Sequence, residues 1–178
     1  MIRQYANVLS ADLCDWLIDT FNESEHAHKH QQTKVMDFVE YNFTENKSNL
    51  MGGEEKHQEV AKALKKALRD YMAEMKVTIF PEVGGVEAFR VKRYLKNSSQ
   101  DFKLHIDCAN KASSQRFLAF LFYLNNSDGE TEFTRQGLKA TPIQGSVLIF
   151  PPTWEYPHIG HPTKDNDKYI MSTYLHYG

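Results

Sequence analysis

A histidine and an aspartate stand two positions apart in the segment KLHIDCAN, residues 103–110. In a β-strand, residues i and i+2 point to the same face. His105 and Asp107 would then present an imidazole nitrogen and a carboxylate side by side, with Leu104 and Ile106 packed on the other face. Both groups bind metal ions, but a surface His–Asp hydrogen bond has the same spacing. An H-x-D triplet alone is therefore a weak signal, and its meaning depends on partners elsewhere in the chain.

A second histidine would complete a three-ligand site. His158 lies in the late segment WEYPHIGHP, and His161, three residues on, would face the opposite side of a strand. Two imidazoles and one carboxylate that leave coordination positions open are typical of non-haem Fe(II) oxygenases. Lys168, in KDNDKYIMSTYLHYG, would supply a fixed cation near such a site and hold a carboxylate by a charge-assisted hydrogen bond. The sequence therefore indicates an iron site beside a carboxylate-binding lysine.

Length and composition narrow the class of protein. The 178 residues predict one domain, and the 41% hydrophobic and 25% charged residues are typical of a globular chain. A formal net charge of -2 gives no electrostatic footprint for nucleic acid or a membrane surface. The start lacks the plan of a secretory signal, and the longest apolar run, FLAFLFYL, is too short to cross a bilayer. Two cysteines, Cys14 and Cys108, favour a reducing compartment. We expect a cytoplasmic, water-soluble protein with no nucleic-acid or membrane partner.

The first third of the chain reads as helical. Ser10 is a suitable N-cap for a helix over ADLCDWLIDTFNE, and a second helix is expected over residues 54–75, where apolar residues recur at helical spacing. The segment between them, SEHAHKHQQTK, is polar and predicts a solvated loop. Its three alternating histidines, His26, His28 and His30, lack an ordering set of neighbours, so we do not expect a metal site there.

The pattern changes to strands after PEVGG, residues 81–85. Short alternating or apolar runs broken by Gly, Pro, Asn and Asp turns predict an antiparallel sandwich or barrel. The expected class is α+β: a jelly-roll core over about 86–178, braced by helical N-terminal support over about 1–85, within a single domain 1–178. A jelly roll is the natural candidate because it wraps two sheets around a cavity. In the last strand, alternation places Lys168, Ile170, Ser172 and Tyr174 on one face, so Tyr174 should line that cavity.

Six motifs follow one another along the second half of the chain: H-x-D, YLN, GETEF, GSVLIFP, HIGHP and KY. Their order resembles the Fe(II)/2-oxoglutarate-dependent dioxygenases, in particular the prolyl 4-hydroxylase-like branch. The resemblance covers roughly residues 86–177, and NVLSADLCDWLIDTF is similar to the helical start of that branch. It implies a double-stranded β-helix, a cupin-like jelly roll with the metal between its sheets. That agrees with the strand pattern.

The resemblance implies roles for individual residues. His105, Asp107 and His158 match the metal ligands. His158 is favoured over His161 because it precedes IGHP and lies ten residues before Lys168, as the family pattern requires. Lys168 matches the basic residue that binds the distal carboxylate of 2-oxoglutarate.

Three further residues are carried over from the family, and a fourth, Tyr174, comes from the alternation along the last strand. Tyr123 of YLN matches a tyrosine that hydrogen-bonds the distal carboxylate, and Tyr94 matches an upstream tyrosine near the cosubstrate and metal. Arg116, seven residues before Tyr123, matches an arginine at the mouth of the active site, where Tyr174 would join it in binding substrate. The segment LKNSSQDFKL departs from the family pattern, so a loop that contacts substrate should have a different shape here.

The implied reaction is hydroxylation of an aliphatic C–H bond, with a peptidyl proline as the first choice of substrate. Succinate and CO2 are released. The resemblance implies Fe(II), 2-oxoglutarate and O2, admits ascorbate as a reductant, and assigns no catalytic side chain beyond the metal ligands. The alternative is a non-catalytic metal-binding or ligand-binding jelly roll. A nucleic-acid demethylase is disfavoured because no arginine follows Lys168 and the charge is not basic. The substrate stays open between a peptide or protein and a small molecule, and the sequence says nothing of the oligomeric state.

Overall fold

The computed structural model describes all residues, 1–178. Three α-helices, α1 (Ala11–Glu23), α2 (Phe43–Asn46) and α3 (Gly53–Glu74), lie in the first half of the chain, with the 3-10 turns Glu25–Ala27 and Lys47–Asn49. A third such turn, Lys111–Ser113, lies in the second half. The strands are β1 (Arg3–Tyr5), β2 (Lys29–Gln32), β3 (Asp37–Asn42), β4 (Val83–Val86), β5 (Arg90–Tyr94), β6 (Phe102–His105), β7 (Arg116–Tyr123), β8 (Thr131–Phe133), β9 (Leu138–Ala140), β10 (Val147–Phe150), β11 (His158–Gly160) and β12 (Lys168–Tyr177).

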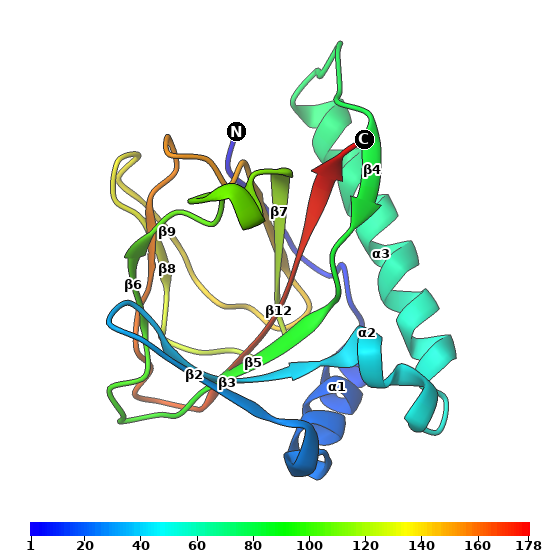
Figure 1. Ribbon diagram of the computed structural model, residues 1–178, viewed down its shortest axis with the longest axis vertical. Coiled ribbons are helices and arrows are strands. Elements are labelled where there is room, and N and C mark those ends of the chain that lie inside the picture. The colour runs from blue at the N-terminus through cyan, green and yellow to red at the C-terminus, as the bar shows by residue number, and fades with distance from the viewer.

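The strands form two antiparallel sheets. The larger sheet has eight strands in the order β1-β10-β7-β12-β5-β3-β2, with β4 also paired to β12, and the smaller has the order β6-β11-β8-β9. Figure 1 shows α1 and α3 against the large sheet, on the side away from β6, β8 and β9. This arrangement confirms the predicted α+β class with a two-sheet core and helices outside it.

Each face of the large sheet packs against a different layer. On β12, Tyr169, Met171 and Leu175 belong to the core shared with the helices, whereas Ile170 and Tyr174 belong to a second core between the sheets. The side chains alternate because successive residues of a strand point to opposite faces. The alternation that buries one set against the helices therefore directs the other set toward the space between the sheets.

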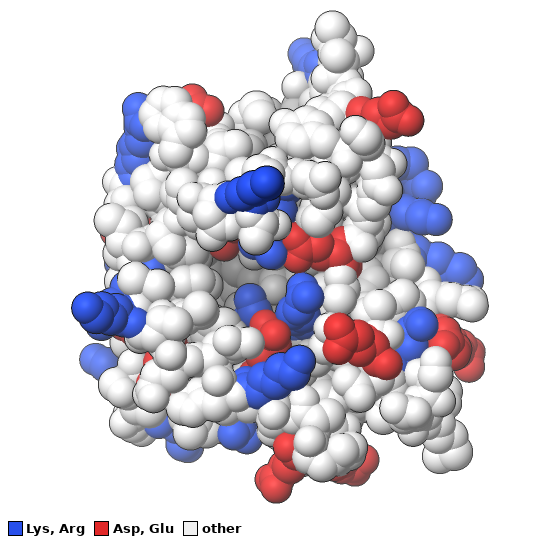
Figure 2. Space-filling model, viewed as in Figure 1, with Lys and Arg blue, Asp and Glu red and all other residues white.

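The two long helices begin where the sequence predicts. The Ser10 hydroxyl accepts a hydrogen bond from the backbone N–H of Leu13, and α1 buries Leu13, Leu17 and Phe21. Helix α3 starts after Gly52, whose φ of 73° is a conformation that glycine adopts without strain. No helix has an apolar stretch long enough to cross a bilayer. On the face drawn in Figure 2, acidic and basic side chains are interspersed.

The N-terminal segment contributes more than helices. Strands β1, β2 and β3 extend the large sheet, and the prediction of a solvated loop over residues 24–34 was wrong. His30 lies 2.8 Å from Asp37 across the β2–β3 pair, and His28 packs against Phe21 with its Nε2 2.8 Å from the Phe21 carbonyl oxygen. An edge strand with exposed polar side chains on both faces gives no apolar alternation, so the sequence pattern cannot distinguish it from a loop.

Candidate active site

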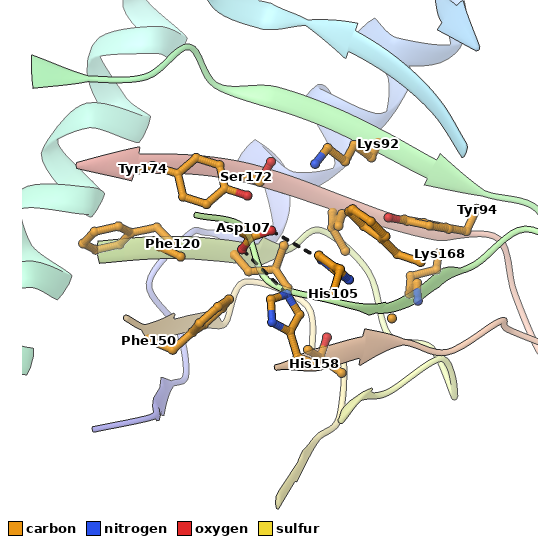
Figure 3. Close-up of a pocket in the computed structure, with 16 residues that line it drawn as sticks. Lys92, Tyr94, His105, Asp107, Phe120, Phe150, His158, Lys168, Ser172 and Tyr174 are labelled. Atoms are coloured by element: carbon orange, nitrogen blue, oxygen red, sulfur yellow. Dashed lines mark ion pairs between the residues drawn. The ribbon is translucent and has the colours of Figure 1, made fainter. Parts of the chain in front are cut away.

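Three side chains with metal-binding atoms converge between the sheets. Pairing of β11 with β6 sets His158 opposite His105, and Asp107 follows β6. One ligand atom from each of the three lies within 4.8 Å of the others. His105 Nε2 is 3.3 Å from Asp107 Oδ1, and His158 Nε2 is 3.6 Å from Asp107 Oδ2, as the dashed lines in Figure 3 show. The structure thus brings together the three residues that the sequence singles out as metal ligands.

The reason for their proximity differs from the one inferred from strand alternation. Strand β6 ends at His105, and Asp107 lies in the bend that follows, so the two do not share a strand face. Leu104 is 54% exposed, so the expectation that it packs in the core was also wrong. In this bend the Asp107 carboxylate lies close to both imidazoles.

Backbone carbonyls orient the two imidazoles. His105 Nδ1 lies 2.6 Å from the carbonyl oxygen of Lys103, and His158 Nδ1 lies 3.0 Å from that of Tyr156. A carbonyl only accepts, so each Nδ1 carries the proton and each Nε2 keeps its lone pair for the shared centre. Stacking of His105 on the Phe102 ring, with ring centres 3.4 Å apart, fixes its plane further.

The protonation states suit a metal. Burial lowers the pKa of His158, which favours the neutral imidazole. Burial acts to raise the pKa of Asp107, but the His158 and His105 imidazoles attract the carboxylate whenever they carry a proton, and this outweighs burial and holds that pKa well below its usual range, so Asp107 is ionised. Two neutral imidazoles and one carboxylate are the donor set that Fe(II) accepts, and three protein ligands leave positions open.

Lys168 ends deeper in the same cavity. Its side chain is 2% exposed, and Nζ donates to the carbonyl oxygens of His161, at 2.6 Å, and Gly129, at 3.1 Å. Burial lowers the pKa of Lys168 to about 8, and its ammonium has no carboxylate in contact. A Cβ at position 129 would lie 3.0 Å from Nζ, so the glycine of GETEF leaves room for the lysine. An ammonium with one free N–H in a buried cavity can hold a carboxylate.

The three tyrosines that the sequence singles out take two kinds of position. Tyr94 lines the cavity, and its ring centre lies 4.5 Å from the ammonium of Lys168. Tyr174 also lines it, as the alternation along β12 predicts. The Tyr123 hydroxyl donates instead to Thr131 Oγ1 at 2.8 Å, and Thr131, not Tyr123, faces the cavity.

Arg116 is held by an acidic residue that sequence reasoning missed. Its Nε and Nη2 donate to the two carboxylate oxygens of Glu87, at 2.5 and 2.9 Å, and Nη1 donates to the Asp107 carbonyl oxygen at 3.0 Å. The guanidinium also covers the ring of Tyr174 at 4.0 Å. Arg116 therefore fixes the backbone of the bend that carries Asp107. Nothing in the spacing of Glu87 reveals this pair, because 29 residues separate the partners.

His161 lies apart from the three converging groups. Its Nε2 is 2.6 Å from a carboxylate oxygen of Glu132, and its side chain is 34% exposed. It contributes its backbone carbonyl oxygen to Lys168 instead. The sequence-based preference for His158 over His161 agrees with this placement.

A wider groove leads from the cavity to the surface. It has a volume of about 520 Å³, and Figure 2 shows the hollow with basic and acidic side chains at its rim. Six residues line both the groove and the inner cavity, and they define the junction between them: Lys92, Phe102, His105, Asp107, Ser172 and Tyr174.

Known proteins share this architecture. Residues 89–176 match the family described as the 2OG-Fe(II) oxygenase superfamily. No curated protein sequence matches the chain. Three similar solved structures each align with 99% of this chain. The viral collagen prolyl hydroxylase of Paramecium bursaria Chlorella virus-1 has a TM-score of 0.73, 20% identity and 96% of its own length covered. A Pseudomonas putida prolyl-4-hydroxylase has a TM-score of 0.73 and 14% sequence identity, with 92% of its own length covered. A Trichoplax adhaerens prolyl hydroxylase has a TM-score of 0.72 and 16% sequence identity, with 83% of its own length covered. It was solved with a peptide fragment of the hypoxia inducible factor oxygen degradation domain.

Proposed function

The chain belongs to the 2OG-Fe(II) oxygenase superfamily through residues 89–176, and from this premise we propose that it hydroxylates a peptidyl proline. Its class as a 2-oxoglutarate-dependent dioxygenase that uses Fe(II), 2-oxoglutarate and O2 follows from the family, and the converging donor set fits the metal. The single observation that supports the proposal most is the joining of a two-histidine, one-carboxylate cluster to a buried lysine without a carboxylate partner.

We assign His105, Asp107 and His158 to the iron. Bound iron and 2-oxoglutarate supply the oxidation that inserts one oxygen atom of O2 into a C–H bond, with release of succinate and CO2. These three side chains would supply three ligands to the metal and would leave its other coordination positions without a protein ligand. Arg116 is a positioning residue in this scheme, because it holds the Asp107 backbone, and its predicted contact with substrate stays a prediction.

We assign Lys168 to the distal carboxylate of 2-oxoglutarate. Its free N–H and its burial favour a charged ligand group over water. Tyr94 would pack beside that carboxylate. Tyr123 would orient Thr131, because the Tyr123 hydroxyl donates a hydrogen bond to Thr131 Oγ1. Direct contact of Tyr123 with the cosubstrate stays a prediction.

The shape of the groove favours a peptide over a small metabolite. The groove of about 520 Å³ is open and continues outward from the metal cluster, so a chain could extend past the oxidised residue. The Trichoplax neighbour was solved with a peptide, which is a fact about that protein and supports the choice here. We further propose that residues 1–178 act as one domain. A cytoplasmic location stays a prediction that rests on the two unpaired cysteines.

The test begins with the purified chain under anaerobic conditions. Addition of Fe(II) and 2-oxoglutarate should produce a weak visible charge-transfer band, and addition of O2 should yield succinate. Proline-containing peptide libraries should then show a +16 mass shift on proline, with ascorbate tested as a stimulant. Asp107→Ala is the control, because it lacks one ligand. No band and no succinate would favour the non-catalytic alternative. Succinate without oxidised proline would retain the dioxygenase and reject the substrate.

A further inference from the structure

Lys92 is a buried lysine at the junction between the cavity and the groove. It lies on β5 two residues before Tyr94, is 8% exposed, and lines both spaces. Its ammonium lies 5.0 Å from the centre of the Phe38 ring. Figure 3 shows this ammonium on the Ser172 side of the cavity, away from Tyr94 and Lys168. Lys92 is therefore placed on the side of the cavity that opens to the groove.

The two arginines that line the groove, Arg90 and Arg116, are paired with carboxylates, but Lys92 is not. Arg116 binds both carboxylate oxygens of Glu87. Arg90 donates to Glu87 at 3.3 Å and lies 3.7 Å from Glu40. The Lys92 ammonium has no hydrogen bond or ion pair with any protein group, and it lies 5.0 Å from the centre of the Phe38 ring. A buried charge without a partner is rare because burial disfavours it, and burial also lowers the pKa of this lysine.

With Fe(II) and 2-oxoglutarate bound, the positive charge of Lys92 would have no negative charge to balance it. Two positive charges from Fe(II) and one from Lys168 offset Asp107 and the two carboxylates of 2-oxoglutarate. The two arginines, Arg90 and Arg116, offset Glu40 and Glu87. One positive charge, that of Lys92, then remains at the junction that faces the incoming substrate.

We propose that Lys92 is a specificity-determining residue that binds a carboxylate of the substrate close to the carbon that is oxidised. The inference rests on the proposed function and names the chemistry of its substrate. A singly charged carboxylate fits better than a phosphate, because Glu40 lies within electrostatic range of Lys92 and no second lysine or arginine lines the junction to balance a dianion. Ser172, whose hydroxyl has no protein partner, lines the same junction and offers a second hydrogen-bond donor.

The carboxylate has two sources that share this chemistry: an acidic side chain beside the proline, or the free α-carboxylate of an amino acid or a C-terminus. Four probes distinguish them. A blocked peptide with Glu beside proline and its Gln counterpart test the side chain. The Gln peptide with a free C-terminal carboxylate and free L-proline test the α-carboxylate.

The measurement is calorimetric binding of each probe to the wild-type enzyme loaded anaerobically with Fe(II) and 2-oxoglutarate. One of the carboxylate probes should bind about 10- to 100-fold more tightly than the blocked Gln peptide, the range for a hydrogen bond to a charged group. Lys92→Met should abolish that preference, and Lys92→Arg should retain part of it. Lys96→Met removes the same charge from an exposed lysine after β5 and should leave the preference unchanged.

Three results would overturn the assignment of Lys92. They are equal binding of all four probes, a preference that survives in Lys92→Met, and no binding of any carboxylate probe. Loss of 2-oxoglutarate affinity in Lys92→Met with an intact carboxylate preference would also reject it, because the lysine would then serve the cosubstrate. Succinate formation and oxidised proline, measured in the same samples after addition of O2, report separately on the proposed function. Thermal unfolding of each variant verifies that it is folded.

Discussion

Replacing Lys168 with methionine would remove the ammonium from the deep end of the cavity while keeping nearly the same side-chain volume. The metal ligands would stay in place, because none of them contacts Lys168 Nζ, whose partners are the carbonyl oxygens of His161 and Gly129. The substitution therefore separates the binding of 2-oxoglutarate from the binding of iron. We expect Fe(II) affinity in the absence of 2-oxoglutarate to stay near the wild-type value.

The size of the effect follows from burial. Lys168 is 2% exposed, so a carboxylate that binds there loses its water and gains the ammonium in exchange. Truncating one partner of a buried charge pair costs about 2–5 kcal/mol, which is roughly a 30- to 5000-fold loss of affinity. Lys168→Met should therefore raise the 2-oxoglutarate dissociation constant by at least about 30-fold.

The stability of the free enzyme should respond much less. The fall of the Lys168 pKa from 10.5 to about 8 corresponds to about 3 kcal/mol of unfavourable desolvation, and methionine would relieve it. The variant would also leave two carbonyl oxygens without the lysine donor, at a cost of about 1–3 kcal/mol each. These effects oppose each other, so the free energy of unfolding should change by no more than about 3 kcal/mol in either direction.

The assay is a calorimetric titration of 2-oxoglutarate into Fe(II)-loaded protein without oxygen, for wild type, Lys168→Met and Lys168→Arg. The arginine variant should recover part of the affinity if its longer fork fits the pocket. Lys164→Met, an exposed lysine in the loop before β12, controls for net charge. Wild-type affinity in folded Lys168→Met would refute the reasoning, because the lysine would then bind only the two backbone carbonyls.

Three further predictions concern the same site. Asp107→Ala should abolish most Fe(II) binding and turnover with a small loss of stability, since the carboxylate faces a cavity; iron titration and thermal unfolding check this. His158→Ala should lose iron, whereas His161→Ala should keep it because His161 pairs with Glu132; the reverse result would show that the wrong histidine was chosen. The 2-oxoglutarate dissociation constant should be flat below pH 8. Above pH 8 the dissociation constant should rise by up to tenfold for each pH unit. Lys168 must be protonated to bind the carboxylate of 2-oxoglutarate, and burial lowers its pKa to about 8 in the free enzyme. Lys168→Arg, which stays charged, should lack that rise.

The face of β12 that carries Lys168 could be predicted from local alternation, whereas the choice of His158 came from the order of motifs that the chain shares with the family. Strand alternation places Lys168 and Tyr174 on one face of β12, and the structure puts both on the cavity. The same rule failed for Asp107, whose place depends on a bend after β6. A bend of this kind is set by contacts with β11 and with Arg116, which are distant in sequence and leave no periodic signal.

The ion pairs around the site could not be predicted from the sequence for a related reason. Glu87 binds both Arg116 and His176, and the three come from separate parts of the chain. Each of them read alone is an ordinary surface residue of its type. Glu87 directly follows β4, and only the pairing of β12 with β4 and β7 brings the three residues together, which is fixed by the fold as a whole.

Lys92 shows how a functional hypothesis can arise where the sequence is silent. In the segment RVKRY it is one of three basic residues within four positions, and all three read alike as solvated charges. The fold buries this one at the junction and gives its neighbour Arg90 an acidic partner. Burial of an unpaired ammonium disfavours folding, so its presence is explained if a ligand supplies the missing charge. The deep lysine, Lys168, obeys the same rule with 2-oxoglutarate as the proposed partner. Two buried lysines without carboxylate partners therefore indicate two carboxylates, one from the cosubstrate and one from the substrate.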